Sequence, residues 1–545
     1  MIVGIDLGTT NSLVSAYVDG NPAILPNERG NRLTPSILSV ADDGELLVGE
    51  SAKNQSVVHA DRTVRTVKRS IGSQRTFELA GEQLTPEEIS AEILKSLKGS
   101  AEAYLGTEVG EAVITVPAHF NDSQRHATQE AGRVAGLQVR LLLNEPTAAA
   151  LAYADRGGVG ERIVVYDLGG GTFDVTCLVR EADGFFVKST LGDNNLGGVD
   201  FDRLLGEEVF RVFEEQSGFS FEDDPFLEQQ LSQLVERAKI ELSSNPAASV
   251  VLPFMGTGGR PMHLRYDVRR EGFEELISGL VDRTVALTRK AMEEAGFQGI
   301  DALVLSGGSS RVPLVQRRLE KSFGVPAAPL VNPDEVVALG AAIQARNLST
   351  GDAGTLHDVS SYALGVEIDG GSVIHIIKRN TPLPAHSSRV FTTIADMQEV
   401  AEVHVLQGDS TKAKDNISLG RFTLSGIQRG GKGNPRIEVS FSVDHDGMTQ
   451  VHARDLATKS SERITIIPAL ESDDPAAEAR RLSALIRRAE QLLDVGGTSL
   501  EREFAVEAAE ILAGARRASL EGGNGTLSEY RLALESLVQE LNTYM

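Results

Sequence analysis

Two carboxylates flank three successive glycines in the stretch VVYDLGGGTFD, residues 164–174. The glycines at 169–171 leave the backbone without side chains, so a large anion can approach main-chain N–H groups that form an anion-binding nest. Asp167 and Asp174 would repel that anion unless a hard cation lay between them, and Mg²⁺ held by carboxylates, phosphate oxygens and water meets this need. Taken alone, the stretch could also be a glycine-rich hairpin without a ligand.

The same arrangement occurs near the N-terminus, where IVGIDLGTTNS (residues 2–12) runs from an apolar stretch into aspartate, glycine and hydroxyl residues. Asp6 and Asp167 therefore occupy equivalent places in two halves of one domain. A third apolar stretch ends in a glycine turn in ALVLSGGSSR, residues 302–311. Short β-branched runs that end in turn signals are typical of buried strands. The repetition predicts two similar α/β lobes with a phosphate chain held between them.

The elements that would position these residues change along the chain. Residues 1–346 alternate strand and helix patterns, as α/β folds do, and residues 347–358 are polar and contain glycine, which is typical of a linker. Strict alternation over residues 436–444 predicts a half-buried antiparallel strand, so we expect a compact all-β domain at 359–470. Apolar residues at helical spacing predict three amphipathic helices in residues 471–545.

Length and composition restrict the function. A chain of 545 residues is too long for one core, so at least two domains are expected. The net charge of −24 argues against nucleic acid or an anionic membrane as a partner. The single cysteine, Cys177, excludes an internal disulfide framework, and its apolar neighbours predict a buried, inert thiol. With no secretory signal and no long apolar run, we expect a cytoplasmic protein.

Several motifs resemble those of the seventy-kilodalton heat-shock chaperones, and the resemblance covers about residues 2–470. It implies an actin-like two-lobed α/β ATPase domain at 1–346, a linker at 347–358, an antiparallel β-sandwich that binds peptide at 359–470, and a short α-helical lid at 471–545. The motifs are IDLGTTNS, VPAHFNDSQR, NEPTAAALAYA, DLGGGTFD, GDNNLGGVDFD and LSGGSSRVP for the ATPase domain, and NTPLPAHSSRVFTT, VHVLQGD and DNISLGRFTLSGI for the sandwich.

The resemblance implies Mg²⁺-dependent ATP hydrolysis and gives each matching residue a role. Asp6 and Asp174 would flank the Mg²⁺. The residues expected around the γ-phosphate and the attacking water are Lys68, Glu145, Asp167 and Thr172. The residues expected to hold the rest of the nucleotide are Gly8, Thr9, Thr10, Gly169, Gly170, Gly171, Gly197, Gly198, Glu236, Lys239, Ser243, Gly307, Gly308, Ser309, Arg311 and Asp334.

Some of these assignments depend on the resemblance alone. By pattern, Lys68 in RTVRTVKR would be an exposed lysine, and residues 236–244 (ERAKIELSS) would be a solvated helix face. Val199 departs from the glutamate usual in the family at that position.

The resemblance also implies coupling between the ATPase domain and the sandwich, with Pro117 and Arg125 at the relay positions. The linker departs from the family, because the usual leucines become Thr355, Leu356 and His357. At about 25 cal/mol per Å² of apolar area, two lost leucines would weaken linker docking by a few kcal/mol. We therefore expect a weaker allosteric signal or one that uses other contacts.

The implied peptide groove departs from the family as well. Its lining positions are Val366, Ile368, Phe391, Gln398, Ala401 and Val403. Ala401 replaces a bulkier residue and predicts a wider pocket for the anchoring side chain of an extended peptide. Asp369 and Ile394 replace the residues that arch over the peptide. Either the aspartate disfavours acidic peptides, or these loops simply tolerate change.

The leading expectation is an ATP-dependent chaperone whose partners are unfolded or extended polypeptides, a J-domain cochaperone and a nucleotide exchange factor. An actin-like scaffold ATPase and a small-molecule kinase of the same fold are the alternatives, and the predicted sandwich argues against both. The short lid, the altered linker and the altered arch favour a specialised member with few clients. The C-terminal ELNTYM lacks the acidic tail of eukaryotic cytosolic members, which favours a bacterial type.

Overall fold

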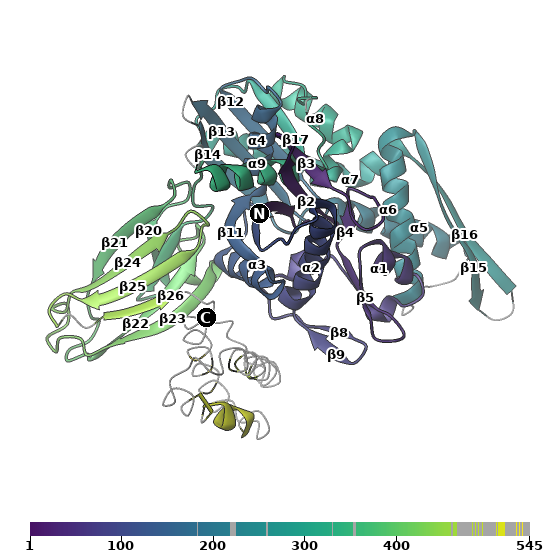
Figure 1. Cartoon of the computed structure of the whole chain (residues 1–545). Coiled ribbons are helices and arrows are strands. Elements are labelled where there is room, and N and C mark those ends of the chain that lie inside the picture. Colours follow the sequence, from purple (N-terminus) through teal and green to yellow (C-terminus); the bar gives the residue numbers. More distant parts are fainter. Residues whose placement is uncertain are drawn as a thin grey trace. The chain divides into compact units, whose positions relative to one another are not determined.

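A computed structural model describes most of the chain, and the chain divides into two compact units, Met1–Ala469 and Leu470–Met545 (Figure 1). In the first unit the described residues are 1–465 apart from 182–183, 218–224, 258–259, 330, 352–355 and 459–460. In the second unit they are 482, 486, 489, 493, 508–509, 511–517, 530, 534 and 537.

The N-terminal sheet has the strand order β11-β10-β1-β2-β3, with β4 paired to β2. Strand β1 (Ile2–Asp6) runs parallel to β10 (Glu111–Val116) and antiparallel to β2 (Asn11–Val18). Helix α2 (Pro86–Leu105) shares a buried apolar core with this sheet. The neighbouring elements are β3 (Asn21–Leu25), β4 (Thr34–Pro35), β5 (Ile37–Val40), β6 (Leu46–Val48), α1 (Glu50–Gln55), η1 (Ala60–Arg62), β7 (Thr63–Arg65), η2 (Val67–Ser70), β8 (Phe77–Leu79), β9 (Glu82–Leu84), α3 (Asp122–Val134) and β11 (Gln138–Asn144).

A second sheet has the order β17-β12-β13-β14-β18. Strand β12 (Arg162–Leu168) is antiparallel to β13 (Phe173–Glu181), and their register places Asp167 opposite Asp174. The glycine turn between these strands is therefore a hairpin with one carboxylate on each side. The other strands are β14 (Gly184–Asp193), β17 (Ala302–Ser306) and β18 (Leu356–His357).

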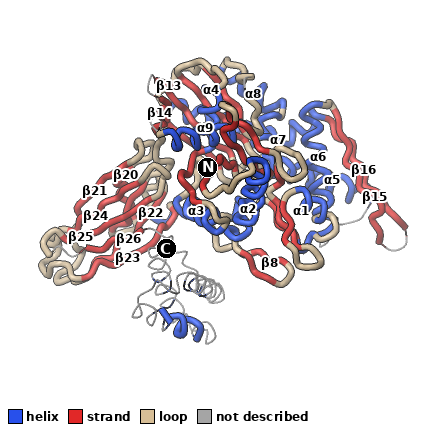
Figure 2. Tube along the Cα trace, viewed as in Figure 1, coloured by secondary structure: helices blue, strands red, loops and turns tan. Residues whose placement is uncertain are grey.

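Helices α4 (Glu145–Asp155) and α9 (Val336–Thr350) share one buried core with strands of both sheets (Figure 2). Their small residues let the helices approach closely: a Cβ on Gly340 would lie 1.8 Å from the carbonyl oxygen of Ala148, so only glycine fits there. Helix α9 continues to Thr350 and so occupies the first residues of the predicted linker at 347–358.

Further helices pack on the second sheet around another large core. Cys177 is fully buried on β13, which confirms its predicted burial, and that burial raises the pKa of its thiol to about 12. The elements here are α5 (Gly198–Ser217), α6 (Pro225–Ser244), β15 (Ala247–Thr257), β16 (Arg260–Arg269), α7 (Arg270–Glu294), η3 (Gly308–Arg311) and α8 (Pro313–Phe323).

Residues 364–465 form two antiparallel four-stranded sheets with the orders β20-β19-β22-β23 and β21-β24-β25-β26. Side chains of β24 (Ile437–Val443) alternate between buried and half-buried, which confirms the alternation predicted for this segment. The other elements are β19 (Leu364–Ile368), β20 (Ser372–Ile377), β21 (Ala385–Phe391), β22 (Val400–Gln407), η4 (Ala413–Asp415), β23 (Ile417–Ser425), β25 (Thr449–Asp455) and β26 (Ser461–Thr465). Apolar side chains from both sheets fill the space between them.

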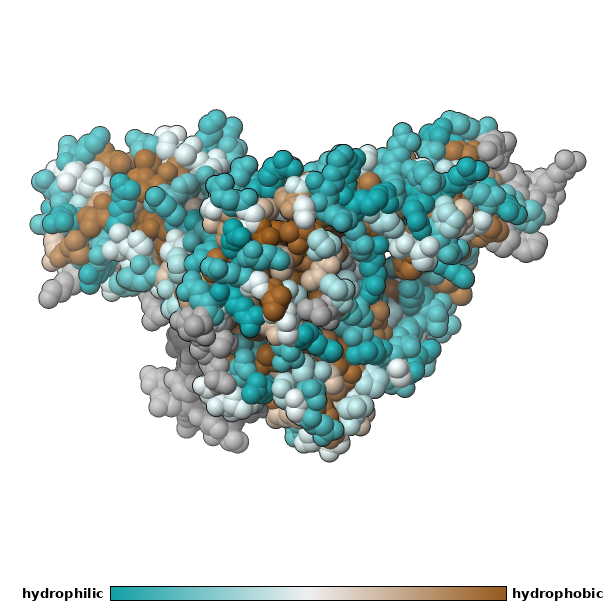
Figure 3. All heavy atoms as spheres, turned by 90° about the horizontal axis from the view of Figure 1, so that it is seen from above, coloured by the Kyte–Doolittle hydropathy of each residue, from teal (hydrophilic) through white to brown (hydrophobic). Residues whose placement is uncertain are grey.

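The described residues of the second unit are helical and share a small core that includes Leu482, Ile486, Leu512 and Leu534. Most of the predicted lid, residues 471–545, lies outside the described residues. Among the helices that are described, none is both long and apolar enough to cross a membrane. In Figure 3, hydrophilic residues cover most of the visible face, and apolar residues are exposed among them on the sandwich at the left of the view.

Candidate active site

Two turns pack against each other, and residues of both line a cavity of about 410 Å³. One turn follows β1 and carries Thr9 and Thr10, and the other joins β12 to β13. A Cβ on Gly170 would lie 2.0 Å from Thr10 Oγ1, and a Cβ on Gly171 would lie 2.5 Å from Thr9 Oγ1. Any side chain at either glycine would therefore displace the opposing threonine.

Most of the predicted ATPase residues line this cavity, although they come from distant parts of the chain. They are Asp6, Gly8, Thr9, Thr10, Lys68, Glu145, Asp167, Gly169, Gly170, Thr172, Glu236, Lys239, Ser243, Gly307, Gly308, Ser309, Arg311 and Asp334. The predicted residues outside the lining lie directly behind it. A Cβ on Gly197 would lie 2.6 Å from Gly170 C, Gly198 N donates to Gly169 O at 2.9 Å, and Asp174 Oδ1 accepts a hydrogen bond from His119 N at 3.0 Å.

A buried ion pair lies in the wall of the cavity. Lys68 Nζ is 2.5 Å from Glu145 Oε1, and the two residues are only 5% and 7% exposed. Lys68 is on η2 and Glu145 is the first residue of α4. The burial of Lys68 excludes the alternative that this residue is an exposed lysine of a basic stretch.

Four carboxylates gather around this one lysine. Two causes raise the pKa of Asp6 to about 7 and the pKa of Asp174 to about 8. The larger cause is burial, and the second is the negative charge of Glu145. The same two causes hold the pKa of Asp167 well above its ordinary range. Lys68 opposes the shift at Asp6 but does not cancel it. The arrangement therefore has an excess of negative charge that an added cation would offset.

Arg69 clamps the glycine turn, and the sequence argument missed it. Its Nη2 donates to Gly171 O at 2.8 Å and also lies 2.5 Å from Asp200 Oδ2. In the sequence, only its position next to Lys68 could have indicated that Arg69 belongs to the site. Val199, the departure from the family pattern, donates its backbone N–H to Gly170 O at 2.8 Å, so this contact does not depend on the side chain at 199.

Two predicted nucleoside-binding residues are held by ion pairs at the far end of the cavity. Lys239 Nζ is 2.7 Å from Asp202 Oδ2, and Glu236 Oε2 is 3.1 Å from Arg65 Nη2. Lys239 also donates to Gly198 O at 3.1 Å, which ties α6 to the start of α5. Asp202 and Arg65 were not predicted, because their roles arise only when distant segments meet.

The third glycine turn completes this end of the cavity. Arg311 Nε donates to Asp334 Oδ2 at 2.9 Å, and Ser309 Oγ donates to Gly169 O at 2.9 Å. Ile240 lines the cavity and is 63% exposed, so it offers an apolar surface there. The sequence argument also missed Ile240, because helical spacing alone placed this residue on a solvated helix face.

The Hsp70 protein family model matches residues 2–79 and 74–543. The chain belongs to the Hsp70 family. Hsp70 proteins in general are ATPases that act as chaperones and bind unfolded polypeptides.

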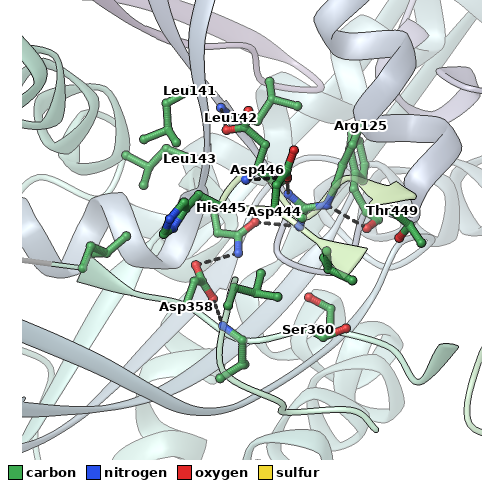
Figure 4. Close-up of a pocket in the computed structure, with 18 of the residues that line it drawn as sticks. Arg125, Leu141, Leu142, Leu143, Asp358, Ser360, Asp444, His445, Asp446 and Thr449 are labelled. Carbon is green, nitrogen blue, oxygen red and sulfur yellow. Dashed lines mark hydrogen bonds between the residues drawn. The ribbon is translucent and has the colours of Figure 1, made fainter. Parts of the chain in front are cut away.

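In this Hsp70 chain, Arg125 on α3 joins the N-terminal sheet to the sandwich (Figure 4). Its Nη2 donates to Asn144 Oδ1 at 2.8 Å, and its Nη1 donates to the carbonyl oxygen of Asp446 at 3.0 Å. Asp446 Oδ1 in turn accepts from Leu142 N at 2.9 Å. Pro117, the other predicted coupling residue, begins the turn before α3, where its carbonyl accepts from Phe120 N at 3.1 Å. These contacts border a second cavity of about 500 Å³.

The predicted peptide-binding residues of the Hsp70 sandwich differ in exposure. Val366, Ala401 and Val403 are buried in the core between the sheets. Phe391 packs against that core and is half-buried, as is Ile368. Gln398 is also half-buried and closes its loop by accepting from Ile394 N at 3.2 Å and donating to Val400 O at 2.6 Å. The apolar residues exposed around these positions are Ile394, Met397 and Val400.

Proposed function

We propose that this protein is an ATP-dependent chaperone that binds extended apolar polypeptide segments in its β-sandwich, with capture and release controlled by ATP binding and hydrolysis. The observation that carries the proposal is the buried Lys68–Glu145 pair, which lines one cavity together with two glycine turns. Family membership supports the chaperone function. The direct contacts of Arg125 with the sandwich support the coupling.

The proposed chemistry is transfer of a phosphoryl group to water, which needs positioning and charge neutralisation more than covalent help. The backbone of the two turns would hold the phosphates, with Thr9, Thr10 and Thr172 as hydroxyl donors. Lys68, oriented by Glu145, would position the attacking water and offset developing charge. Ser309, Arg311 and the residues of α6 would hold the nucleoside end.

Asp6 and Asp174 fit a Mg²⁺ site, because both are buried carboxylates with raised pKa and the Oδ2 atom of Asp174 has no hydrogen-bond partner. Among the described residues, no group of three or more His, Cys, Asp or Glu could hold a metal ion directly. This fits an ion that keeps several waters and is held by one or two carboxylates with phosphate oxygens. When bound, Mg²⁺ would neutralise phosphate charge.

We propose that the apolar positions of the sandwich around Val366, Ala401 and Val403 anchor the client, and that a J-domain cochaperone and a nucleotide exchange factor act on the ATPase part. The proposed division of the chain is an ATPase domain at 1–346, a linker at 347–358, a sandwich at 359–470 and a lid at 471–545. Family membership supports the binding of a client polypeptide.

Peptide-stimulated ATP hydrolysis tests the proposed function. The hydrolysis rate of the full chain would be measured with and without Mg²⁺, and with and without a short apolar peptide. We expect hydrolysis that requires Mg²⁺ and that the peptide accelerates. Hydrolysis that no peptide changes would favour the scaffold ATPase, and phosphate transfer to an added sugar would favour the small-molecule kinase.

A further inference from the structure

The outer face of one sandwich sheet carries a serine, a histidine and a glutamate that hydrogen-bond in series. Glu367 is on β19, His404 on β22 and Ser418 on β23, and these strands are neighbours in the sheet (Figure 1). His404 Nδ1 is 2.5 Å from Glu367 Oε2, and His404 Nε2 is 2.9 Å from Ser418 Oγ. All three residues lie outside the lining of the ATPase cavity, so the cluster is a separate feature of the chain.

The register of the sheet brings the glutamate and the histidine together. Val366 on β19 pairs with Val405 on β22, and both valines are buried in the core between the sheets. Successive strand residues face opposite sides. The next pair, Glu367 and His404, therefore lies on the outer face with its side chains side by side.

A β-bulge brings the serine to the same face. Arg421 on β23 pairs with His404, so it also belongs to the outer face. Ser418 comes three residues before Arg421, and strict alternation would place the two on opposite faces. The register shifts between Val405 and Leu406, which adds one residue to β23 and returns Ser418 to the side of the histidine ring.

The hydrogen bonds of the cluster have one consistent direction. The hydrogen bond from His404 lowers the pKa of Glu367 below its ordinary range, so this carboxylate is ionised at neutral pH and only accepts. His404 Nδ1 must then carry the proton of the neutral ring, which leaves Nε2 as an acceptor for the hydroxyl of Ser418. A hydroxyl that donates to a histidine oriented by a carboxylate is the arrangement of an activated nucleophile.

Access and rigidity favour reaction at the serine. Ser418 is exposed, whereas the side chain of His404 is only 11% exposed, so the base is shielded and the nucleophile is open to solvent. Arg421 Nη2 is 3.2 Å from the same Oε2 atom of Glu367, and Arg421 Nη1 is 2.5 Å from Glu402 Oε1. Contacts from two strands therefore hold the carboxylate that orients the ring.

We propose that Ser418 is a nucleophile activated by His404 and oriented through Glu367, and that it takes the acyl group of small activated esters. Ser418 Oγ attacks the carbonyl carbon and its proton passes to His404 Nε2. The bond to the leaving alcohol breaks, and the alcohol takes that proton. Water then attacks the acyl group on Ser418 in the same way, which releases the carboxylic acid and restores the hydroxyl.

The open face restricts the substrate. An exposed sheet surface does not enclose the carbonyl oxygen in a water-excluded site, so the reaction requires an ester with a good leaving group. Water is the only co-reactant. The inference does not depend on ATP binding or hydrolysis, because the cluster shares no residue with the ATPase cavity.

The test uses the full chain and p-nitrophenyl acetate. Release of p-nitrophenol is followed by absorbance, and mass spectrometry after an acid quench locates the acetyl group. We expect acetylation of Ser418, and the hydrolysis rate above that of the Ser418→Ala chain should fall by about 100-fold in His404→Gln. Glu367→Gln should lower it by about tenfold or more, because the ring is no longer held in the reactive tautomer.

Glu367 is a positioning residue, and a spectroscopic signature tests that role. Glu367→Gln should remove the downfield proton resonance of His404 Nδ1, whereas Ser418→Ala should keep it, since the short hydrogen bond to the carboxylate remains. Ser388→Ala is the matched control. Ser388 is an exposed serine on β21 whose hydroxyl donates to Glu438 at 3.2 Å, so it has a carboxylate neighbour without the histidine between them. It should stay unacetylated, and its substitution should leave ester hydrolysis unchanged.

Labelling of the wild-type chain decides the proposal even if a variant fails to fold. A fluorophosphonate probe should label Ser418 of the wild-type protein and leave Ser388 unlabelled. An unmodified Ser418 with both reagents would overturn the inference, as would acetylation confined to lysines. Equal acetylation of Ser418 in the wild type and in His404→Gln would also overturn it, because the hydroxyl would then react without its base. A chain that fails to hydrolyse ATP would contradict the proposed function and leave this test unaffected.

Discussion

Lys68 Nζ lies 2.5 Å from Glu145 Oε1 in the wall of the cavity of about 410 Å³, and 77 residues separate the two in sequence. A buried charge pair leaves a strongly destabilising single charge if one partner is removed. The pair therefore ties the helix α4 to the η2 turn. It shares the lining of the cavity with the two glycine turns.

Lys68→Ala should leave ATP binding nearly intact and slow hydrolysis by about 100-fold or more, because a lysine that acts on the attacking water matters mainly in the transition state. Calorimetry and single-turnover hydrolysis measure the two quantities separately. Lys95→Ala is the matched control, since Lys95 is an exposed lysine paired only with Glu92 among the described contacts. Wild-type hydrolysis in Lys68→Ala would contradict the assigned role.

Gly170→Val should weaken ATP binding by about 10- to 100-fold, because forcing a side chain into filled space typically costs 1–3 kcal/mol. The new Cβ would start 2.0 Å from Thr10 Oγ1. Gly110→Val is the control, because a Cβ at Gly110 meets no atom within 4 Å. Equal ATP affinity in the two variants, measured by calorimetry, would rule out the triple-glycine turn as a phosphate site.

Arg125→Lys should reduce the stimulation of hydrolysis by peptide while leaving basal hydrolysis unchanged. A lysine cannot span both Asn144 Oδ1 and the carbonyl of Asp446, which the guanidinium contacts together. Arg133→Lys, on the exposed side of the same helix, should behave like the wild type. Full peptide stimulation in Arg125→Lys would show that coupling takes another route.

Docking of the sandwich on α3 should strengthen as the pH falls. Asp122 is fully buried, accepts from Thr449 N at 2.8 Å and faces Arg125, His126 and Asp444; burial raises its pKa to about 7. Separation would expose Asp122 and return its pKa toward 3.8, so docking takes up a proton. The stabilisation is complete below the lower pKa and is lost as the pH rises through about 7.

The expected change between about pH 8 and pH 6 is a shift toward the docked state of less than about tenfold, because burial lowers the pKa of the neighbouring His126 and so opposes the effect of Asp122. Fluorescence energy transfer between one dye on α3 and one dye on the sandwich would measure the docked fraction at each pH. Asp122→Asn should abolish the shift toward the docked state in this range. A shift toward the docked state that persists in Asp122→Asn would assign the effect to another group.

Deleting residues 475–545 should raise the rate of peptide dissociation only slightly, because we expect a lid of 75 residues to add little to the barrier for dissociation, and interface differences appear mainly in off-rates. Residues 1–469 form a compact unit by themselves, so the truncated chain should keep its fold. Dissociation of a fluorescent peptide from the full and truncated chains measures the effect. An off-rate that rises by orders of magnitude would show that the lid clamps its client.

The sequence determined the local chemistry of this protein. Glycines, hydroxyl residues and aspartates that follow short apolar runs predict turns able to hold an anion, because those residues act through their own backbone and nearest neighbours. The alternation at 437–443 likewise predicted a strand with one buried side, because a side-chain period of two is a property of the strand itself. These features needed no knowledge of distant contacts.

Tertiary structure decided which of the charged and aromatic residues meet. Arg69 reaches Gly171 across 102 residues, and Arg65 reaches Glu236 across 171, so neither pair leaves a pattern in the sequence. The linker illustrates the same limit: His357 stacks on the ring of Phe186, which belongs to a separate strand far away in the sequence. Burial, pairing and pKa depend on what the fold places around a residue, and a single sequence does not contain that information locally.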